Sequence, residues 1–283
     1  MTTLQIRPLT RAELGAGLDW AAEEGWNPGL HDADSFHATD PGGFLLGLLD
    51  AEPVSMVSAV RYGAGFGFIG FYIVRPAWRG RGHGLAVWRA AMERLAGRTI
   101  GLDGVVAQQA AYRRSGFALA WNNVRYEGVA RRIARADAPQ VSIEPLTQAT
   151  AELLDYDAPF FPEDRSRFVR LWIAQAGSTA RAARRRGRFA GYGAIRPCRS
   201  GFKVGPLFAD DAELADRLLC ELVACVPAGA PVQLDIPAAN PSALELVRAH
   251  GMRPVFETAR MYTGVAPRLP IARLFGITTF ELG

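Results

Sequence analysis

The alternation of apolar and polar positions in the first 130 residues predicts a succession of short strands and amphipathic helices. Residues 4–9 are predicted to form a first strand, and residues 11–24 place their apolar side chains on one helical stripe. A shorter acidic helix is expected at residues 32–39. An antiparallel meander of three strands follows, with Asp/Gly-rich turns between them. These strands are expected at residues 44–49, 54–60 and 66–74.

The segment after residue 74 predicts a crossover back to the same sheet. A glycine- and arginine-rich turn leads into a long amphipathic helix, and residues 99–106 then form an apolar strand. Because strands joined through a crossover helix are usually parallel neighbours, we expect this strand to run parallel to the one at 66–74. A short helix at 108–115 and a strand at 118–127 complete the pattern.

Three short segments of the first half recur in the same order in the second half, which indicates two copies of one mixed α+β fold. The stretch from Arg131 to Gln140 is charged and contains a proline, so we place the junction there. The predicted domains are residues 1–133 and residues 140–283. The recurring pairs are residues 6–10 and 143–147, residues 102–103 and 234–235, and residues 126–130 and 262–266.

Composition excludes several classes of protein. The 283 residues are 49% hydrophobic and 21% charged, and no apolar run reaches the roughly 18 residues that a membrane span needs, so we expect no membrane partner. The N-terminal sequence is unlike a signal peptide, which predicts a cytoplasmic protein. The arginine-rich run at 181–188 lacks interleaved aromatic residues, which favours a solvated turn over a nucleic-acid site. The three cysteines show no C-x-x-C spacing, so no metal is implied, and the oligomeric state stays open.

The turn Arg79-Gly80-Arg81-Gly82-His83-Gly84 stands between the strand at 66–74 and the long helix. Backbone N–H groups in such a turn, together with the positive end of a helix, can hold a diphosphate. A P-loop would need Lys and then Ser or Thr after the last glycine, whereas Leu85 and Ala86 follow Gly84. A G-x-G-x-x-G dinucleotide site is a weak alternative, because Leu85 replaces its third glycine. A flexible surface turn is the remaining alternative.

The pattern Arg-x-x-Gly-x-Gly after an apolar strand resembles the pyrophosphate loop of the GCN5-related N-acetyltransferase (GNAT) superfamily. The order of predicted elements in residues 4–130 is similar to that fold, and the two-domain arrangement is similar to GNAT proteins of the YitH type. The resemblance implies acetyl-CoA as cosubstrate, with its thioester oxygen bound by a backbone N–H at the end of the strand at 66–74. The implied cofactor-binding residues are Ile73, Val74, Arg79, Gly80, Arg81, Gly82, His83, Gly84, Leu85 and Tyr112.

A second motif carries the same resemblance. GNAT enzymes commonly have a tyrosine four residues before a Gly-Phe pair, and Tyr112 stands four residues before Gly116-Phe117. The resemblance implies that Tyr112 protonates the leaving thiolate. The chain departs from the family upstream, where Val105 replaces a common asparagine and Gln108 replaces a small alanine.

The general base and the acceptor contacts are less defined. Glu23, Glu24 and Asp32 flank the helix break at Trp26-Asn27, which in this fold faces the acceptor channel, so Trp26, Asn27 and Asp32 are expected to contact the acceptor. Glu24 and Asp32 are the leading base candidates. Asp103 interrupts an apolar strand and is another. Since Asp235 recurs at the equivalent point of the second copy, a structural hydrogen bond is favoured for Asp103.

The second copy lacks both chemical parts of the first. The acidic turn at 209–213 contains no glycine and would repel a diphosphate, and Val247 stands where a tyrosine would be needed. We therefore expect residues 140–283 to form a wall or cap of the acceptor pocket. The predicted function is transfer of an acetyl group from acetyl-CoA to a primary amine of a small acceptor by direct attack in a ternary complex. The acidic stretch at 12–60 favours a cationic acceptor. The alternatives are an acyl-CoA-binding regulator without transferase activity and, more remotely, a nicotinamide-dependent oxidoreductase.

Overall fold

The computed structural model describes residues 4–283, and its first half follows the predicted order of elements closely. The strand at 44–49, the strand at 66–74 and the helix at 32–39 begin and end at the predicted residues. The elements are β1 (Gln5–Pro8), α1 (Arg11–Glu23), α2 (Asp32–Thr39), β2 (Phe44–Leu49), β3 (Glu52–Tyr62), β4 (Phe66–Val74), α3 (His83–Arg94), β5 (Thr99–Val105), α4 (Gln109–Arg114) and β6 (Phe117–Val129).

The second half repeats this order, which confirms the internal repeat. Short 3-10 helices lie at Pro76–Trp78 and Val106–Gln108 in the first half, and at Ala158–Phe160 and Ile271–Arg273 in the second. The elements are β7 (Val141–Pro145), α5 (Ala151–Asp157), α6 (Ser166–Ile173), β8 (Thr179–Arg185), β9 (Arg188–Pro197), β10 (Phe202–Ala209), α7 (Ala212–Val223), β11 (Pro231–Pro237), α8 (Pro241–Ala249), β12 (Arg253–Thr263) and β13 (Leu274–Gly276).

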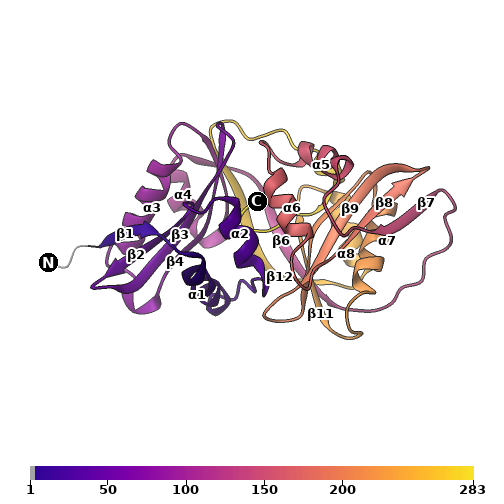
Figure 1. Cartoon of the computed structure of the whole chain (residues 1–283), viewed down its shortest axis with the longest axis horizontal. Helices are drawn as coiled ribbons and strands as arrows, with labels where there is room; N and C mark the ends of the chain where they lie inside the picture. Colours follow the sequence, from indigo (N-terminus) through magenta and orange to yellow (C-terminus); the bar gives the residue numbers. More distant parts are fainter. Residues whose placement is uncertain (1–3) are drawn as a thin grey trace.

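The two halves share one mixed sheet because they exchange their last strands (Figure 1). The strand order is β1-β2-β3-β4-β5-β12-β6-β11-β10-β9-β8-β7, with β13 beside β10. Strand β12 of the second half therefore pairs with β5 and β6 of the first, and β6 pairs with β11 of the second. The sequence predicts a final strand for each copy, but periodicity alone cannot show which half that strand joins.

Two buried ion pairs fix this exchange at equivalent points of the two halves. Asp103 on β5 lies opposite Arg260 on β12, and Asp235 on β11 lies opposite Arg125 on β6. Each arginine contacts its carboxylate through two nitrogens, at 2.7 and 2.5 Å for Asp103 and at 2.7 and 2.8 Å for Asp235. Breaking a buried pair of this kind costs about 3–5 kcal/mol, so each pair strongly favours this strand arrangement. The predicted structural role of both aspartates is consistent with these contacts.

The C-terminal segment after β13 returns to the middle of the molecule, where Figure 1 marks the C-terminus between the two halves. Residues 278–283 are all buried. The Tyr62 hydroxyl donates a hydrogen bond to the Leu282 carbonyl at 3.1 Å. A Cβ atom at Gly70 would overlap the main chain of Glu281, so β4 and the tail are in direct backbone contact. The tail thus packs against the catalytic half predicted from the sequence.

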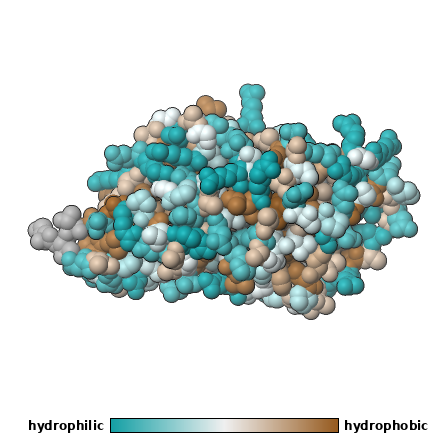
Figure 2. Space-filling view, in the orientation of Figure 1, coloured by the Kyte–Doolittle hydropathy of each residue, from teal (hydrophilic) through white to brown (hydrophobic). Residues whose placement is uncertain are grey.

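Apolar side chains fill the space between the sheet and its helices in both halves. Figure 2 shows one face of the molecule, on which hydrophilic residues predominate and hydrophobic residues occur in small groups. Within residues 4–283, no helix has both the length and the apolar character that a membrane crossing requires.

Candidate active site

A gap opens in the sheet where β4 and β5 stop pairing. The two strands are parallel neighbours, as predicted, only from Phe66 opposite Thr99 to Ile69 opposite Leu102. Beyond this point β4 contains a bulge, because two residues lie between the pairs Gly70–Ser58 and Ile73–Met56 where β3 has one. Phe71 in the bulge has a φ of +46°, a region that bulky residues rarely adopt. The bulge turns the end of β4 away from β5 and creates a slot between them.

A cavity of about 620 Å³ occupies this slot and extends to the turn before α3. One end is lined by the glycine turn, and the middle by the diverging ends of β4 and β5. The other end is lined by residues that come from the bulge of β4, from the helix break after α1, from β12 and from the tail. The lining residues at that far end are Trp26, Phe71, Phe256, Thr258, Phe280 and Glu281.

The glycine turn is shaped to expose its main chain. Gly80 and Gly82 have φ values of +75° and +86°, which other residues adopt only with strain. Gly82 caps α3 without a side-chain hydrogen bond, and the first intrahelical bond runs from Ala86 N–H to the Gly82 carbonyl at 3.1 Å. The N–H groups before Ala86 are therefore available to an anion, and the helix dipole adds to their attraction.

Most predicted cofactor residues line this cavity, with two exceptions. Ile73, Val74, Gly80, Gly84 and Leu85 are lining residues, as are Arg79, Gly82 and Tyr112. Arg81 and His83 are not: both lie beside the Trp78 ring, with centroid distances of 5.2 and 5.9 Å.

Arg79 and Glu24 form an ion pair at the loop end of the cavity. The Arg79 Nε also donates to the Val74 carbonyl at 2.9 Å, so this side chain anchors the turn to the end of β4. The pair holds Glu24 toward the glycine turn rather than toward the far end of the cavity.

Tyr112 belongs to α4, and its side chain lies in the cavity wall against β5. It is 7% exposed, and its ring lies 5.6 Å from the Trp88 ring. A Cβ atom at position 104 would overlap the Tyr112 ring, so Gly104 on β5 leaves the space that this side chain occupies. Burial, with a further contribution from nearby Tyr72, raises the pKa of Tyr112 to about 12. The phenol therefore keeps its proton at neutral pH.

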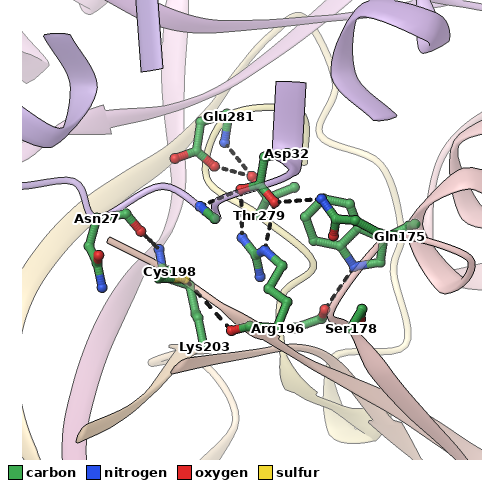
Figure 3. Close-up of polar contacts among 12 residues, drawn as sticks. Asn27, Asp32, Gln175, Ser178, Arg196, Cys198, Lys203, Thr279 and Glu281 are labelled. Carbon is green, nitrogen blue, oxygen red and sulfur yellow. Dashed lines mark hydrogen bonds and ion pairs between the residues drawn. The ribbon is translucent and has the colours of Figure 1, made fainter. Parts of the chain in front are cut away.

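Asp32 lies outside the residues that line the cavity, which corrects its expected place beside the acceptor. Its carboxylate is fully buried and bridges the two halves, as Figure 3 shows. It accepts hydrogen bonds from Arg196 Nε at 2.8 Å, Gln175 Nε2 at 3.0 Å and Gly29 N–H at 2.8 Å. Burial alone would raise the pKa of Asp32, but the charge of Arg196 and these hydrogen bonds lower it. Such a carboxylate is an ion-pair partner and a poor base.

Of the two other residues that were predicted to contact the acceptor, Trp26 lines the cavity and Asn27 does not. The Asn27 side chain instead hydrogen-bonds Ser200 and Gln233 of the second half. The Trp26 carbonyl accepts hydrogen bonds from Arg125 at 2.7 Å and from Lys203 at 3.3 Å, so cations of the shared core hold this loop against the cavity.

The sequence analysis missed the residues that the second half contributes to the far end. Phe256 and Thr258 lie on β12, and Phe280 and Glu281 lie in the tail. No local motif marks them, because they enter the cavity only through the strand exchange and the return of the tail. The Arg125 guanidinium lies over the faces of both rings, 4.9 Å from the centre of Phe280 and 5.7 Å from the centre of Phe256.

The corresponding turn of the second half is already occupied by a carboxylate. Asp211 caps α7 and accepts a hydrogen bond from Leu214 N–H at 3.1 Å. It also pairs with Arg185. A negative side chain therefore sits at the start of α7, a position at which it would repel an anion.

One group of potential metal ligands lies away from the cavity. Atoms of Asp216, Cys220 and His250 lie within 4.8 Å of one another. The Asp216 carboxylate already accepts hydrogen bonds from Arg135 and lies 2.8 Å from His250 Nε2. The Arg135 guanidinium already binds the Asp216 carboxylate, and its positive charge would repel a metal cation at this point. We therefore assign no metal to this group.

Comparisons with known proteins identify the fold of each half. A family described as "Acetyltransferase (GNAT) family" matches residues 12–117, and one described as "Acetyltransferase (GNAT) domain" matches residues 153–276. A curated relative from Pseudoalteromonas sp., named "Holothin acyltransferase", is 29% identical over 281 residues, covering 99% of this chain and 95% of its own.

Two solved structures share the whole two-domain arrangement. A crystal structure from Pyrococcus horikoshii has a TM-score of 0.84 at 24% identity and covers 99% of this chain and 96% of its own. A tandem GNAT protein from the clavulanic acid biosynthesis pathway has a TM-score of 0.66 at 16% identity, with 93% and 100% covered. At these identities the likeness establishes the fold alone.

The two halves have the same fold and share one sheet, and the first half contains the glycine turn and the slot between β4 and β5. Together with the family matches, this arrangement defines a two-domain acyltransferase. The chain belongs to the GNAT family, whose members use acyl-CoA donors.

Proposed function

We propose that the chain transfers the acetyl group of acetyl-CoA to the primary amine of a small acceptor by direct attack in a ternary complex. The observation that carries this proposal is one continuous cavity. It joins the exposed N–H groups before α3 to the slot between β4 and β5, and Tyr112 lies in its wall.

Each part of the cavity has a role in this reaction. The N–H groups at Gly80 to Leu85 bind the diphosphate, and the pantetheine arm enters the slot. A backbone N–H near Ile73 or Val74 binds the thioester oxygen, which is worth about 10²–10³ in rate. The amine nitrogen then attacks the carbonyl carbon, the carbon–sulfur bond breaks, and Tyr112 gives its proton to the departing thiolate. The second half walls the acceptor end.

The acceptor is an amine on a compact, largely apolar body. Aromatic rings of Trp26, Phe71, Phe256 and Phe280 line that end of the cavity. The acidic stretch at 12–60 does not by itself favour additional positive charge, because seven of its carboxylates pair with arginines. These pairs are Glu13–Arg7, Asp19–Arg199, Glu24–Arg79, Asp32–Arg196, Asp34–Arg11, Asp40–Arg94 and Glu52–Arg75.

The proposal is tested by thiol release from acetyl-CoA in the presence of single amines. Because a relative over the whole chain is named for holothin, holothin is the first acceptor to test, beside a panel of small primary amines. We expect amine-dependent release of CoA with one acetylated product per thiol. Tight acetyl-CoA binding without turnover on any amine would instead support a regulatory acyl-CoA-binding protein.

A further inference from the structure

Glu281 stands apart among the carboxylates of the cavity. Of the described residues that line it, Glu24, Asp103 and Glu281 carry carboxylates. Glu24 pairs with Arg79, and Asp103 pairs with Arg260 and accepts a hydrogen bond from Asn123 at 2.7 Å. Glu281 forms no ion pair with any residue in the described range 4–283. Two of the three lining carboxylates are therefore committed to other groups.

The Glu281 side chain is nevertheless held in a defined position. It is only 4% exposed, and the Thr279 hydroxyl donates to one oxygen of its carboxylate. The same hydroxyl accepts a hydrogen bond from the Glu281 N–H at 3.0 Å, which closes a tight turn in the tail. In Figure 3 the other carboxylate oxygen points away from the Asp32–Arg196 pair. That oxygen has no partner among the described residues, so it can accept a proton or a hydrogen bond.

The position of Glu281 places it at the acyl end of the slot. Its main chain contacts Gly70, the residue directly before the bulge that separates β4 from β5. Phe280 and Thr258 beside it belong to the acceptor end of the cavity. An amine that attacks a thioester lodged in the slot must approach from this end, where Glu281 lies.

The charges around Glu281 explain how its carboxylate can stay buried without an ion-pair partner. Arg125, Arg196 and Lys203 all lie close enough to interact with its charge. Arg125 and Arg196 are each bound to an aspartate, and Lys203 donates to the carbonyls of Trp26 and Asn27. Positive charge at a distance thus offsets the burial of the carboxylate while leaving its oxygen unbound.

We infer that Glu281, carried into the catalytic half by the C-terminal tail, binds the acceptor amine and takes its proton during acetyl transfer. The inference rests on the proposed function. As the nitrogen–carbon bond forms, one amine proton passes to the Glu281 carboxylate, while the thiolate takes a proton from Tyr112. Solvent then returns a proton to Tyr112 and removes one from Glu281, so each turnover is balanced. The second half thereby supplies a catalytic residue as well as a wall.

The test compares Glu281→Gln with wild type in the full chain, using acetyl-CoA and the panel amine with the highest wild-type turnover. The amide keeps the shape and can still bond Thr279, but it cannot take the proton. We expect kcat/KM for the amine to fall by about 10²-fold or more. The Kd for acetyl-CoA, measured by calorimetry, should change by less than about threefold, because the diphosphate turn lies at the other end of the cavity.

Glu257→Gln is the matched control, since Glu257 is an exposed carboxylate on β12 between two cavity residues. It should leave both quantities unchanged. Circular dichroism and the melting temperature verify that each variant is folded, and Thr279→Val, which frees the Glu281 side chain, should give a smaller loss of kcat/KM. A Glu281→Gln enzyme within about threefold of wild type would overturn the inference and leave the proposed function intact. A wild-type chain that does not bind acetyl-CoA would overturn both.

Discussion

At the scale of single residues, the proposed chemistry of the first half depends on a buried phenol. The family resemblance, through the motif that ends in Gly116-Phe117, implies a role for Tyr112, and the structure places this residue in the cavity wall against Trp88. Its role as the acid that protonates the thiolate is a proposal that two measurements can test.

Replacing Tyr112 with Phe should lower kcat by about 10²–10⁴-fold, because the departing thiolate loses its proton donor. The Kd for acetyl-CoA should stay within a few-fold, since the ring still fills the space beside Gly104. Steady-state kinetics and calorimetry measure the two quantities. Tyr126→Phe, which changes a partly buried tyrosine packed in the second half, serves as the control. An unchanged kcat would remove Tyr112 from the mechanism.

The pH dependence of kcat gives an independent check. A phenol is neutral when protonated, so burial, which disfavours the phenolate, raises the pKa of Tyr112 to about 12. The proton donor should therefore persist to at least about pH 10.5, where an ordinary tyrosine of pKa about 10 would be mostly ionised. We expect no decline of kcat with an apparent pKa near 10 under saturating substrates. A decline there that Tyr112→Phe abolishes would contradict the assigned environment.

The sequence alone could not show which carboxylates form ion pairs and which remain free to act in the cavity. Asp32 and Glu24 both flank the Trp26 loop, yet Asp32 holds Arg196, which lies 164 positions away in the chain, and Glu24 holds Arg79. A buried carboxylate needs a countercharge, and the partner becomes visible only when the fold brings distant arginines close. Glu281 could not be predicted because it reaches the cavity only through the return of the tail.

At the scale of secondary-structure elements, the sequence was more informative. Strands β2 and β4 and helix α2 have the predicted bounds, because strong apolar runs and helix breakers mark their ends. The parallel pairing of β4 and β5 also followed from the crossover through α3. The bulge at Phe71 was not predicted. It depends on pairing with β3, which a single strand's sequence does not specify.

The proposed binding of the donor depends on the junction of β4 and α3. Gly82→Val should raise the Kd for acetyl-CoA at least about tenfold, because a branched residue resists the positive φ that exposes the N–H groups. Gly97→Val is the matched control. Gly97 has a similar φ of +81°, but it lies after α3 and does not line the cavity. Calorimetric titration with acetyl-CoA compares the variants, and equal losses of affinity in both would point to general destabilisation rather than to a diphosphate site.

At the scale of the whole molecule, the internal repeat predicted two copies but not their exchange of strands. Residues 1–133 and 140–283 were expected to be two domains, yet β12 separates β5 from β6 and β6 separates β12 from β11. Which half a final strand joins depends on contacts more than a hundred residues apart, such as Asp103 with Arg260. These non-local contacts leave no periodic signal.

The exchange predicts that the two halves stay together after the chain is cut between them. A site-specific protease sequence inserted after Asp137, in the exposed connection between β6 and β7, would divide the chain. The two fragments should elute as one species in gel filtration and separate only in denaturant. Uncut protein is the control. Independent elution of the fragments under native conditions would refute the shared sheet.

A crystal structure of the full chain with acetyl-CoA bound would be decisive. We expect the diphosphate to contact the main-chain N–H groups between Gly80 and Leu85. We also expect the thioester to lie between β4 and β5, with Tyr112 beside the sulfur and Glu281 facing the acetyl group. Acetyl-CoA bound instead at the start of α7, or a thioester far from the β4 bulge, would contradict these expectations.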